Sequence, residues 1–247
     1  MERIFNLKTK DDKKIYCLHN TGIKKNKSVV IFVHGLTGNP NEHLFYNAAH
    51  SFPKKGVDVF RFALYWWSDE KHRKLDECSL TTHVEDLNTT LRYLRPKYKN
   101  IIVVGHSLGS PVILKADITL FDNVILWEPS YLEKGIRHEL TEVKVNKQTM
   151  WLSRDAFSYI LKGKLISEWE EFNGKNELHL IAELGKPLKI IAGKKGILLK
   201  GSRAYFKVAK EPKELIIIDN ATHCFDEAGT EAELLKETLS WVKLNSN

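Results

Sequence analysis

Short runs of β-branched and other apolar residues alternate with helical patterns along most of this 247-residue chain. Continuous apolar runs such as Val29–Val33 are typical of strands that are covered on both faces, as in a parallel sheet. The segments between such runs predict crossover helices. The chain is therefore expected to have an α/β fold with a mostly parallel central sheet flanked by helices. The predicted strands are Ile4–Lys8, Lys14–His19, Val29–Val33, Val57–Leu64, Ile101–Val104, Val124–Trp127, Leu188–Ala192 and Leu215–Ile218.

The first two of these strands are expected to form a hairpin around Asp11-Asp12. A helix is predicted over Glu42–Phe52, and another begins near Leu108, where Pro111 is tolerated because it lies in the first turn. Two further helices are predicted to open at the capping boxes Thr82-x-x-Glu85 and Thr230-x-x-Glu233. The first has an apolar stripe of Val84, Leu87, Leu91 and Leu94, and the second runs towards Val242.

One long segment interrupts the alternation. Between Pro129 and Gly185 there is no strong strand pattern, but helical stretches are predicted around Trp151–Leu161 and Leu165–Phe172. More than fifty residues are too many for a simple connection. We interpret residues 130–184 as a small helical cap inserted into a core of residues 1–129 and 185–247. Its aromatic residues either line an acyl pocket or pack the cap onto the core, and they are Trp151, Phe157, Tyr159, Trp169 and Phe172.

The composition is that of an ordinary globular protein, with 43% hydrophobic and 28% charged residues. The net charge is +7, but the lysines are spread along the chain and do not form a recognisable nucleic-acid motif. A solvated basic surface, with at most weak attraction for anionic substrates, is therefore favoured over nucleic-acid binding.

The three cysteines, Cys17, Cys78 and Cys224, form neither a CxxC pair nor a zinc spacing. They favour a reducing compartment and give no sign of a metal site. The apolar runs are far too short to cross a bilayer. We expect a soluble cytoplasmic protein that acts on a small molecule without a membrane partner.

The strongest chemical signal is Gly105-His106-Ser107-Leu108-Gly109, which follows an apolar strand and precedes a helix. This is the setting of a nucleophile elbow, in which a strained turn lifts the serine hydroxyl above the sheet. The neighbouring residues must be small for the backbone to close so tightly. We predict Ser107 as a nucleophile.

A second turn, His34-Gly35-Leu36-Thr37-Gly38, also follows a buried strand directly. A glycine here lets the chain bend so that a backbone N–H faces the serine. We assign an oxyanion hole to the amides of Leu36 and Leu108. His34 is expected to orient this loop and not to transfer protons.

A third segment, Ala221-Thr222-His223-Cys224-Phe225, lies just after the last strand. On this kind of scaffold a catalytic triad has the chain order Ser, acid, His, so His223 is the predicted base. His106 neighbours the nucleophile and is expected to pack away from it. Cys224 is expected to be a small buried residue and not a reactive thiol.

Together these segments resemble the α/β-hydrolase superfamily, and more narrowly its small bacterial and archaeal serine esterases related to cinnamoyl/feruloyl esterases and monoglyceride lipases. The similar stretches are HGLTGN, FRFALYWW, KLDECSLTTHVEDLN, GHSLG and ATHCF. The resemblance covers the chain apart from the predicted cap. It implies Ser107 as nucleophile, His223 as base and Leu36 and Leu108 as oxyanion donors, with no cofactor and no metal.

The chain departs from this family at the acid of the triad. The usual aspartate follows the strand before the last, but Gly196 occupies that place. Glu128, at the end of the strand after the nucleophile helix, is one candidate because some relatives carry their acid there. Asp219, four residues before His223, is a weaker candidate, and a site without an acid is the third interpretation.

The leading functional hypothesis is a serine hydrolase that cleaves carboxylic esters, or thioesters, through an acyl-enzyme. The second is a hydrolase-fold protein with a degenerate triad that binds a ligand without efficient turnover. A nucleotide-binding α/β protein is disfavoured, because neither a GxGxxG nor a GxxxxGK[ST] motif follows any strand.

Overall fold

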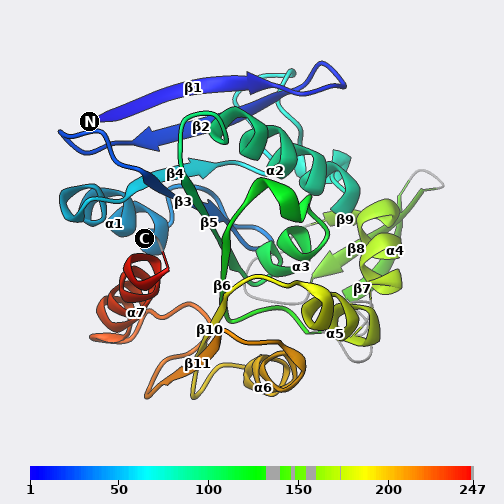
Figure 1. Ribbon diagram of the computed structural model, residues 1–247. Helices are drawn as coiled ribbons and strands as arrows, with labels where there is room; N and C mark the ends of the chain where they lie inside the picture. Colours follow the sequence, from blue (N-terminus) through cyan, green and yellow to red (C-terminus); the bar gives the residue numbers. More distant parts are fainter. Residues whose placement is uncertain (132–139, 146–147, 154–159, 173, 246–247) are drawn as a thin grey trace.

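The computed structural model describes residues 1–131, 140–145, 148–153, 160–172 and 174–245. A central sheet of eight strands has the order β1-β2-β4-β3-β5-β6-β10-β11 (Figure 1). Only the β1–β2 and β2–β4 pairs are antiparallel. The predicted hairpin and the mostly parallel sheet are therefore confirmed. Its strands are β1 (Glu2–Lys8), β2 (Lys14–Asn20), β3 (Ser28–Val33), β4 (Asp58–Phe62), β5 (Asn100–His106), β6 (Asn123–Trp127), β10 (Leu188–Gly193) and β11 (Lys213–Ile218).

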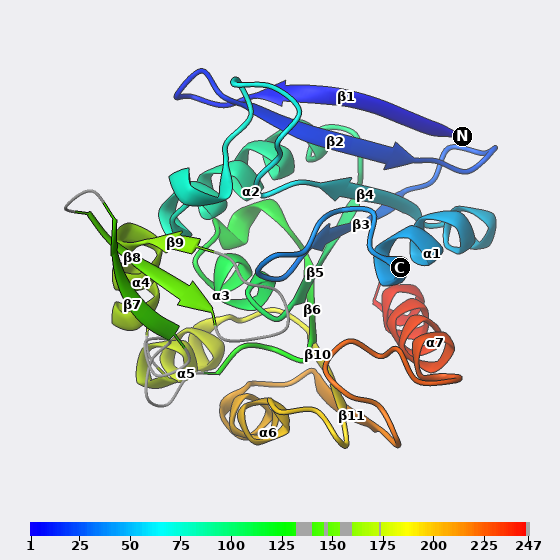
Figure 2. The same ribbon diagram turned by 180° about the vertical axis from the view of Figure 1, so that it is seen from behind.

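Both faces of this sheet are covered by helices, which is why its central strands are apolar on both sides. In β3, Val29, Ile31 and Val33 enter one hydrophobic core, whereas Val30 and Phe32 enter the other. Helices α2, α3 and α6 pack on the first face, and α1 and α7 on the second (Figures 1 and 2). The helices are α1 (His43–Ser51), α2 (Leu80–Leu94), α3 (Gly109–Leu114), α6 (Leu199–Val208) and α7 (Thr230–Leu244).

Both predicted capping boxes are wrong in register. Helix α2 begins at Leu80, and its box is made by Ser79 and Thr82, each hydroxyl accepting from the backbone N–H of the other residue. Helix α7 has Gly229 as its N-cap, and Thr230 donates its hydroxyl to Glu227 O at 2.7 Å. The predicted cap lies three residues after the true N-cap in α2 and one residue after it in α7, because the preceding loop sets where each helix starts.

The insertion is not purely helical, contrary to the prediction. Strands β7 (Leu140–Val145), β8 (Gln148–Ser153) and β9 (Ile160–Lys162) form a separate antiparallel sheet. The predicted helical stretch Trp151–Leu161 thus begins and ends in strands, and residues 154–159 lie outside the described part of the chain. The predicted second stretch matches α4 (Gly163–Glu171), and α5 (Gly174–Glu183) follows. Both views place this unit at the side of the molecule, next to α3 and away from β1 and β2 (Figures 1 and 2).

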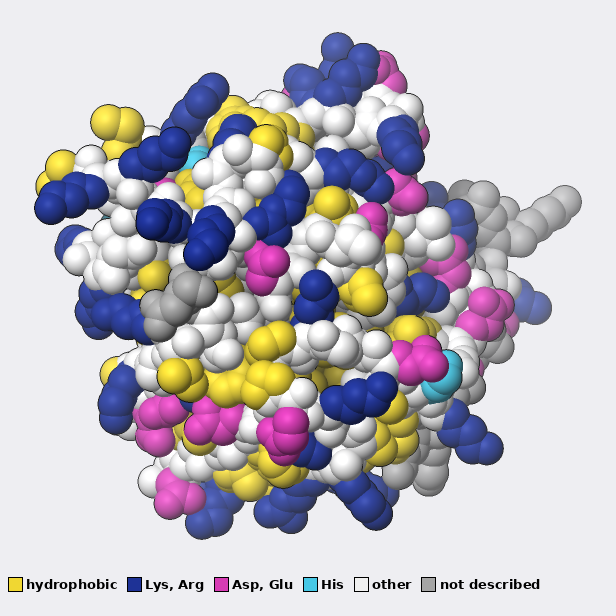
Figure 3. All heavy atoms as spheres, viewed as in Figure 1, with side chains coloured by type: hydrophobic (Ala, Val, Ile, Leu, Met, Phe, Trp, Pro, Cys, Tyr) yellow, Lys and Arg dark blue, Asp and Glu magenta, His cyan; other side chains and the backbone are white. Residues whose placement is uncertain are grey.

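Basic side chains are spread over the face seen in Figure 3, with acidic side chains among them. This distribution agrees with a solvated basic surface. Within the described residues, no helix has both the length and the apolar character that a bilayer crossing requires.

Candidate active site

Ser107 lies on a sharp turn between β5 and α3, at the carboxyl edge of the sheet. Its φ of 52° is in the left-handed region, which a serine adopts at an energetic cost. The turn is closed by hydrogen bonds from Ser107 N to Trp127 O (3.1 Å) and from Ser110 N to Ser107 O (3.0 Å). A Cβ at Gly109 would overlap the carbonyl oxygen of Val33, so only glycine fits there. The predicted elbow geometry is present.

The turn after β3 approaches the serine closely. A Cβ at Gly35 would lie 3.3 Å from the Cβ of Ser107, which leaves little room for a larger residue. His34 holds this turn: its Nδ1 donates to Gly35 O at 2.8 Å, and its Nε2 accepts from Leu64 N at 3.0 Å. Burial lowers the pKa of His34 to about 4, so the ring is neutral as these two contacts require. The geometry agrees with an orienting role for His34.

Leu36, from this turn, lines the same cavity as Ser107 and His223. Leu108 follows the nucleophile directly, and its side chain is completely buried in the core. The two residues whose amides were predicted to bind an oxyanion therefore flank the serine from different loops. Their catalytic role stays a prediction.

The ring of His223 meets a carboxylate. Its Nδ1 lies 3.4 Å from Oε2 of Glu128, whose side chain has 0% exposure, while that of His223 is 27% exposed. The other oxygen of Glu128, Oε1, accepts from Gly193 N at 2.7 Å. Glu128 has a φ of 41°, so the chain turns sharply at the end of β6. These contacts hold the Glu128 carboxylate next to Nδ1 of the His223 ring.

Gly196 explains why this arrangement is possible. A Cβ at residue 196 would overlap the Glu128 carboxyl group, including both of its oxygens. The position from which the usual aspartate would extend is therefore filled by a carboxylate from the neighbouring strand end. Asp219 instead pairs with Lys194 Nζ at 2.8 Å, with both side chains largely exposed. Of the two candidate acids, the structure brings only Glu128 to His223.

His106 has a contact that the sequence interpretation missed. Its ring stacks at a tilt on that of His223, with centroids 4.8 Å apart, and its Nε2 donates to the backbone oxygen of His223 at 2.9 Å. Burial lowers the pKa of His106 to about 3, which keeps the ring neutral. The expectation that His106 points away from the site is therefore wrong: it lines the same cavity as Ser107, and it holds the backbone of the residue proposed as the base.

Ser107 and His223 open into one cavity of about 810 Å³. Cys224 also lines it and is exposed, so the prediction that this cysteine is buried is wrong. Partial desolvation raises the pKa of its thiol, which agrees with an unreactive group. The side chains lining the cavity include Leu36, Thr37, Glu42, His43, Leu44, Tyr65, Trp66, Trp67, Lys74, Leu75, His106, Ser107, His223, Cys224 and Asp226.

The aromatic wall of the cavity does not come from the insertion. Trp169 and Phe172 are buried in the core, Trp151 packs against it, and the predicted Phe157 and Tyr159 lie outside the described residues. The wall is instead formed by Tyr65, Trp66 and Trp67, which begin three residues after the end of β4. The sequence signal for this wall was the run of three consecutive aromatic residues shortly after a predicted strand.

These rings belong to the segment between β4 and α2, residues 63–79, which we call the Trp loop. Trp66 stacks on Tyr16 of β2, with centroids 4.4 Å apart, and on Trp67 at 5.0 Å. Tyr65 donates its hydroxyl to Gly38 O at 2.9 Å, which joins the Trp loop to the turn that carries Leu36. The wall is thus built from stacked rings.

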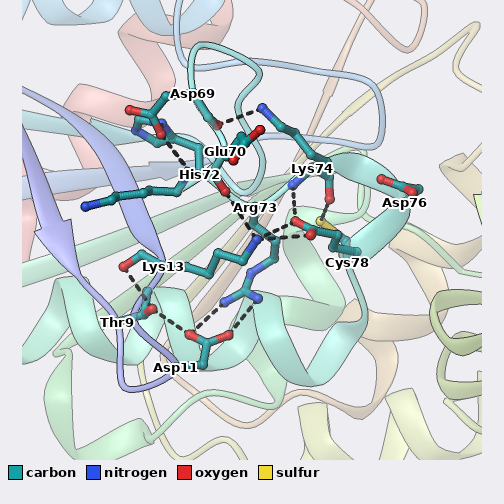
Figure 4. A network of polar contacts seen from close by, with 12 residues as sticks. Thr9, Asp11, Lys13, Asp69, Glu70, His72, Arg73, Lys74, Asp76 and Cys78 are labelled. Atoms are coloured by element: carbon teal, nitrogen blue, oxygen red, sulfur yellow. Dashed lines mark hydrogen bonds and ion pairs between the residues drawn. The ribbon is translucent and has the colours of Figure 1, made fainter.

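A network of charges pins the Trp loop to the β1–β2 hairpin (Figure 4). The buried Arg73 donates to Asp11 at 2.9 Å and, from its Nε, to the buried Asp86 on α2 at 3.2 Å. Lys13 pairs with Glu77 at 2.9 Å. The hydrogen bonds to Arg73 lower the pKa of Asp11 to about 2. The network therefore holds one wall of the cavity from behind.

Within the described residues, no cluster of histidine, cysteine and acidic side chains has an arrangement that could hold a metal ion. The polar groups that line the cavity include the hydroxyl of Ser107 and the imidazole of His223, with the Glu128 carboxylate beneath the imidazole. This set of groups is the one that nucleophilic acyl transfer requires.

Comparisons with known proteins agree with the fold. Residues 12–122 match the model of a family described as "Alpha/beta hydrolase of unknown function (DUF900)". No curated protein has a recognisably similar sequence.

Solved structures of similar fold include esterases. The esterase domain of a Rhodothermus marinus protein is similar over 100% of both chains, with 16% identity and a TM-score of 0.79. Est1E from Butyrivibrio proteoclasticus in a structure with ferulic acid bound is similar over 98% of both chains, with 19% identity and a TM-score of 0.79. The esterase Pf2001 of Pyrococcus furiosus is 19% identical over 100% of this chain and 93% of its own, with a TM-score of 0.72. With its sheet order, its elbow and these structural matches, the chain has the α/β-hydrolase fold.

Proposed function

We propose that this protein is a serine hydrolase that cleaves carboxylic esters, including thioesters, through an acyl-enzyme. The observation that carries the proposal is the contact of the buried Glu128 with His223 in a site where His223 and Ser107 line one cavity. A serine hydroxyl is a poor nucleophile unless a base takes its proton, and an imidazole is an effective base only in the correct tautomer. A buried carboxylate at Nδ1 selects that tautomer.

In the proposed reaction, Ser107 Oγ bonds to the carbonyl carbon while His223 Nε2 takes the hydroxyl proton. The backbone amides of Leu36 and Leu108 donate to the oxyanion of the tetrahedral intermediate. The bond to the leaving alcohol or thiol then breaks, and His223 returns the proton to the departing atom. Water repeats the two steps on the acyl-enzyme and releases the acid and Ser107. Glu128 accepts the Nδ1–H throughout and stabilises the imidazolium.

The hypothesis of a degenerate triad rested on Gly196. Because the Glu128 carboxyl group occupies the space beside Gly196, the missing aspartate is no argument for a site without an acid. The esterase names of structures with the same fold favour an ester as the substrate. No nucleic acid, membrane or cofactor takes part in the proposed reaction.

The wall of the cavity suggests which esters to try first. Trp66 and Trp67 offer flat rings, and Trp67 is 66% exposed. A structural relative is described with ferulic acid bound, which also has a ring. Because aromatic rings stack favourably on indoles, we include esters of acids that carry an aromatic ring in the proposed substrate class. Hydrolysis of methyl 3-phenylpropanoate is expected to exceed that of methyl 3-cyclohexylpropanoate, which has the same leaving group.

A fluorophosphonate probe tests the nucleophile. We expect one equivalent of covalent label per wild-type chain and none on a Ser107→Ala variant, which also loses hydrolysis of p-nitrophenyl esters. A Ser68→Ala variant, which removes an exposed serine of the Trp loop, is the matched control and should label normally. Full activity of Ser107→Ala would refute the proposal. Tight ligand binding without any labelling of the wild type would favour the binding-only hypothesis instead.

A further inference from the structure

Glu42, the residue before α1, places a carboxylate in the wall of the cavity. The half-buried side chain lies against the turn after β3. Its Oε1 accepts from Asn39 N at 3.2 Å, and a Cβ at Gly38 would lie only 2.7 Å from the same oxygen. The carboxyl group therefore packs directly on the turn that carries Leu36, whose amide is proposed to bind the oxyanion.

The charge of this carboxylate has no partner within the described part of the chain. Asn39 N is the only hydrogen-bond donor to its side chain there, and no lysine, arginine or histidine forms an ion pair with it. Asp226, which also lines the cavity, differs because its Oδ1 lies 2.9 Å from Nε2 of His43. Since a carboxylate has about four acceptor sites, most of the capacity of Glu42 is left for a ligand.

The cavity is negative on the side where Glu42 lies. Burial raises the pKa of the Cys224 thiol, and four nearby carboxylates raise it further. These are the carboxylates of Asp226, Glu42, Glu227 and Glu128. The lysine that lines the cavity, Lys74, belongs to the Trp loop and donates to Asp69 O at 2.7 Å. The part of the cavity around Cys224 therefore attracts a positive charge.

The leaving group of the substrate faces this side in the proposed reaction. His223 returns a proton to the departing oxygen, so that atom must lie next to the imidazole. Cys224 is the next residue in the chain and lines the same cavity, as does Glu42. The ring of the acyl group is instead proposed to stack on Trp66 and Trp67. Substituents of the alcohol therefore come closest to Glu42.

We propose that Glu42 is a specificity-determining residue that favours esters whose alcohol carries a positively charged amine. This inference rests on the proposed hydrolase function and narrows its substrate class. The carboxylate attracts the cation equally in the bound substrate and in the transition state, so it lowers KM and leaves kcat largely unchanged. Because the turn already holds the carboxyl group in place, binding costs little ordering of the side chain.

Two esters of 3-phenylpropanoic acid test the proposal, because their alcohols have the same shape. One alcohol is choline, and the other is 3,3-dimethylbutanol, in which carbon replaces the cationic nitrogen. The quantity measured is the kcat/KM of the choline ester divided by that of the neutral ester, at pH 8 and low salt. In Glu42→Gln, the amide oxygen can still accept from Asn39 N, but the charge is gone. We expect this ratio to fall about two- to fivefold through KM, as for a partly exposed ion pair.

Glu70→Gln is the matched control, because it removes an exposed carboxylate of the Trp loop that does not line the cavity. It should leave the ratio unchanged. Salt at about 1 M should lower the ratio of the wild type towards that of Glu42→Gln, since it screens charges that water reaches. A ratio that is the same in Glu42→Gln as in the wild type, or that falls equally in Glu70→Gln, would overturn the proposal.

A binding measurement separates this proposal from the hydrolase function. Ser107→Ala cannot form the acyl-enzyme, so calorimetry can follow the binding of both intact esters to it. Adding Glu42→Gln in this background should weaken binding of the choline ester about two- to fivefold and leave that of the neutral ester unchanged. Equal effects on the two esters, including none, would contradict the recognition of charge. If the effects differ as expected while the fluorophosphonate does not label the wild type, Glu42 recognises the cation and the proposed hydrolase function fails.

Discussion

The two loops that line the cavity are held in different ways. The Trp loop is pinned from behind by Arg73, a permanent cation whose guanidinium is buried with Asp86 and reaches the exposed Asp11. The loop that carries His223, residues 219–229, is held by the burial of Ala221 and Phe225 in the core and also contacts two imidazoles, His106 within the protein and His43 at its surface. The wall that shapes the cavity is thus held by buried charges, whereas the loop that carries the proposed base is held by apolar burial and by the neutral ring of His106. The difference predicts that substitutions beside His223 will mainly lower turnover, whereas substitutions behind the Trp loop will mainly lower stability.

The largest effect is expected on the His223 side, from Glu128→Gln. An amide at this position keeps the shape of the side chain but no longer selects the tautomer with a hydrogen on Nδ1. Turnover should fall by roughly 10²–10⁴-fold, since spoiling the acid's role costs up to about 10⁴. The measurement is kcat on a short ester, with the melting temperature as the control for folding. Unchanged turnover would remove Glu128 from the site.

Moving the acid provides a sharper test of the same side. Gly196→Asp alone should be inactive or unstable, because its Cβ overlaps the Glu128 carboxyl group. Glu128→Ala alone should be as slow as Glu128→Gln. In the double variant Glu128→Ala/Gly196→Asp, the space is free and the new carboxylate replaces the old one. We expect it to be about tenfold or more faster than either single variant, a coupling that independent sites do not show.

Much of the fold and of the candidate site can be predicted from the sequence, but the choice of the acid cannot. Ser107, His223 and the neighbouring strands are recognisable because apolar runs and glycine-flanked turns are local patterns. The choice between Glu128 and Asp219 is not local: it depends on which carboxylate the parallel pairing of β6 with β10 brings beneath the imidazole. The contact of His106 with His223 O and that of His43 with Asp226 also join residues more than a hundred positions apart.

The secondary structure of the insertion was also difficult to predict from the sequence. Its strands pair with each other and not with the central sheet, so the alternation that revealed the main strands does not extend to it. Trp151 and Leu161 have side chains that suit either a helix or a strand, and pairing across β8 and β9 decides between the two. The Trp loop escaped prediction because three consecutive aromatic residues indicate burial, not a wall of a cavity.

Behind the Trp loop, Arg73→Met should lower the stability of the protein more than it lowers turnover. It leaves the buried Asp86 without its cation, and breaking a buried pair in this way costs about 3–5 kcal/mol of unfolding free energy. Arg73→Met/Asp86→Leu removes both charges and should recover most of that loss. Urea unfolding at neutral pH measures the difference. If the double variant is no more stable than the single one, the cost does not come from the uncompensated carboxylate.

The smallest expected effect concerns acid stability, to which the buried imidazoles contribute. Burial lowers the pKa of His34 to about 4 and those of His83 and His106 to about 3. Each is therefore neutral in the folded state but protonated in the unfolded chain below about pH 6.5, so stability falls as the pH drops from there towards the folded values. Each such histidine contributes about 1.4 kcal/mol per pH unit within this window.

His83 isolates this contribution, because neither of its ring nitrogens has a hydrogen-bond partner among the described residues. His83→Leu should reduce the slope of unfolding free energy against pH by about 1.4 kcal/mol per unit between pH 6 and 4. It should leave stability at pH 7 equal or higher, since it removes buried polar atoms that nothing satisfies. His34→Leu should reduce the slope equally but lower stability at pH 7, because it leaves Leu64 N and Gly35 O unpaired. Identical slopes in wild type and His83→Leu would mean that the ring is solvated or partnered in solution.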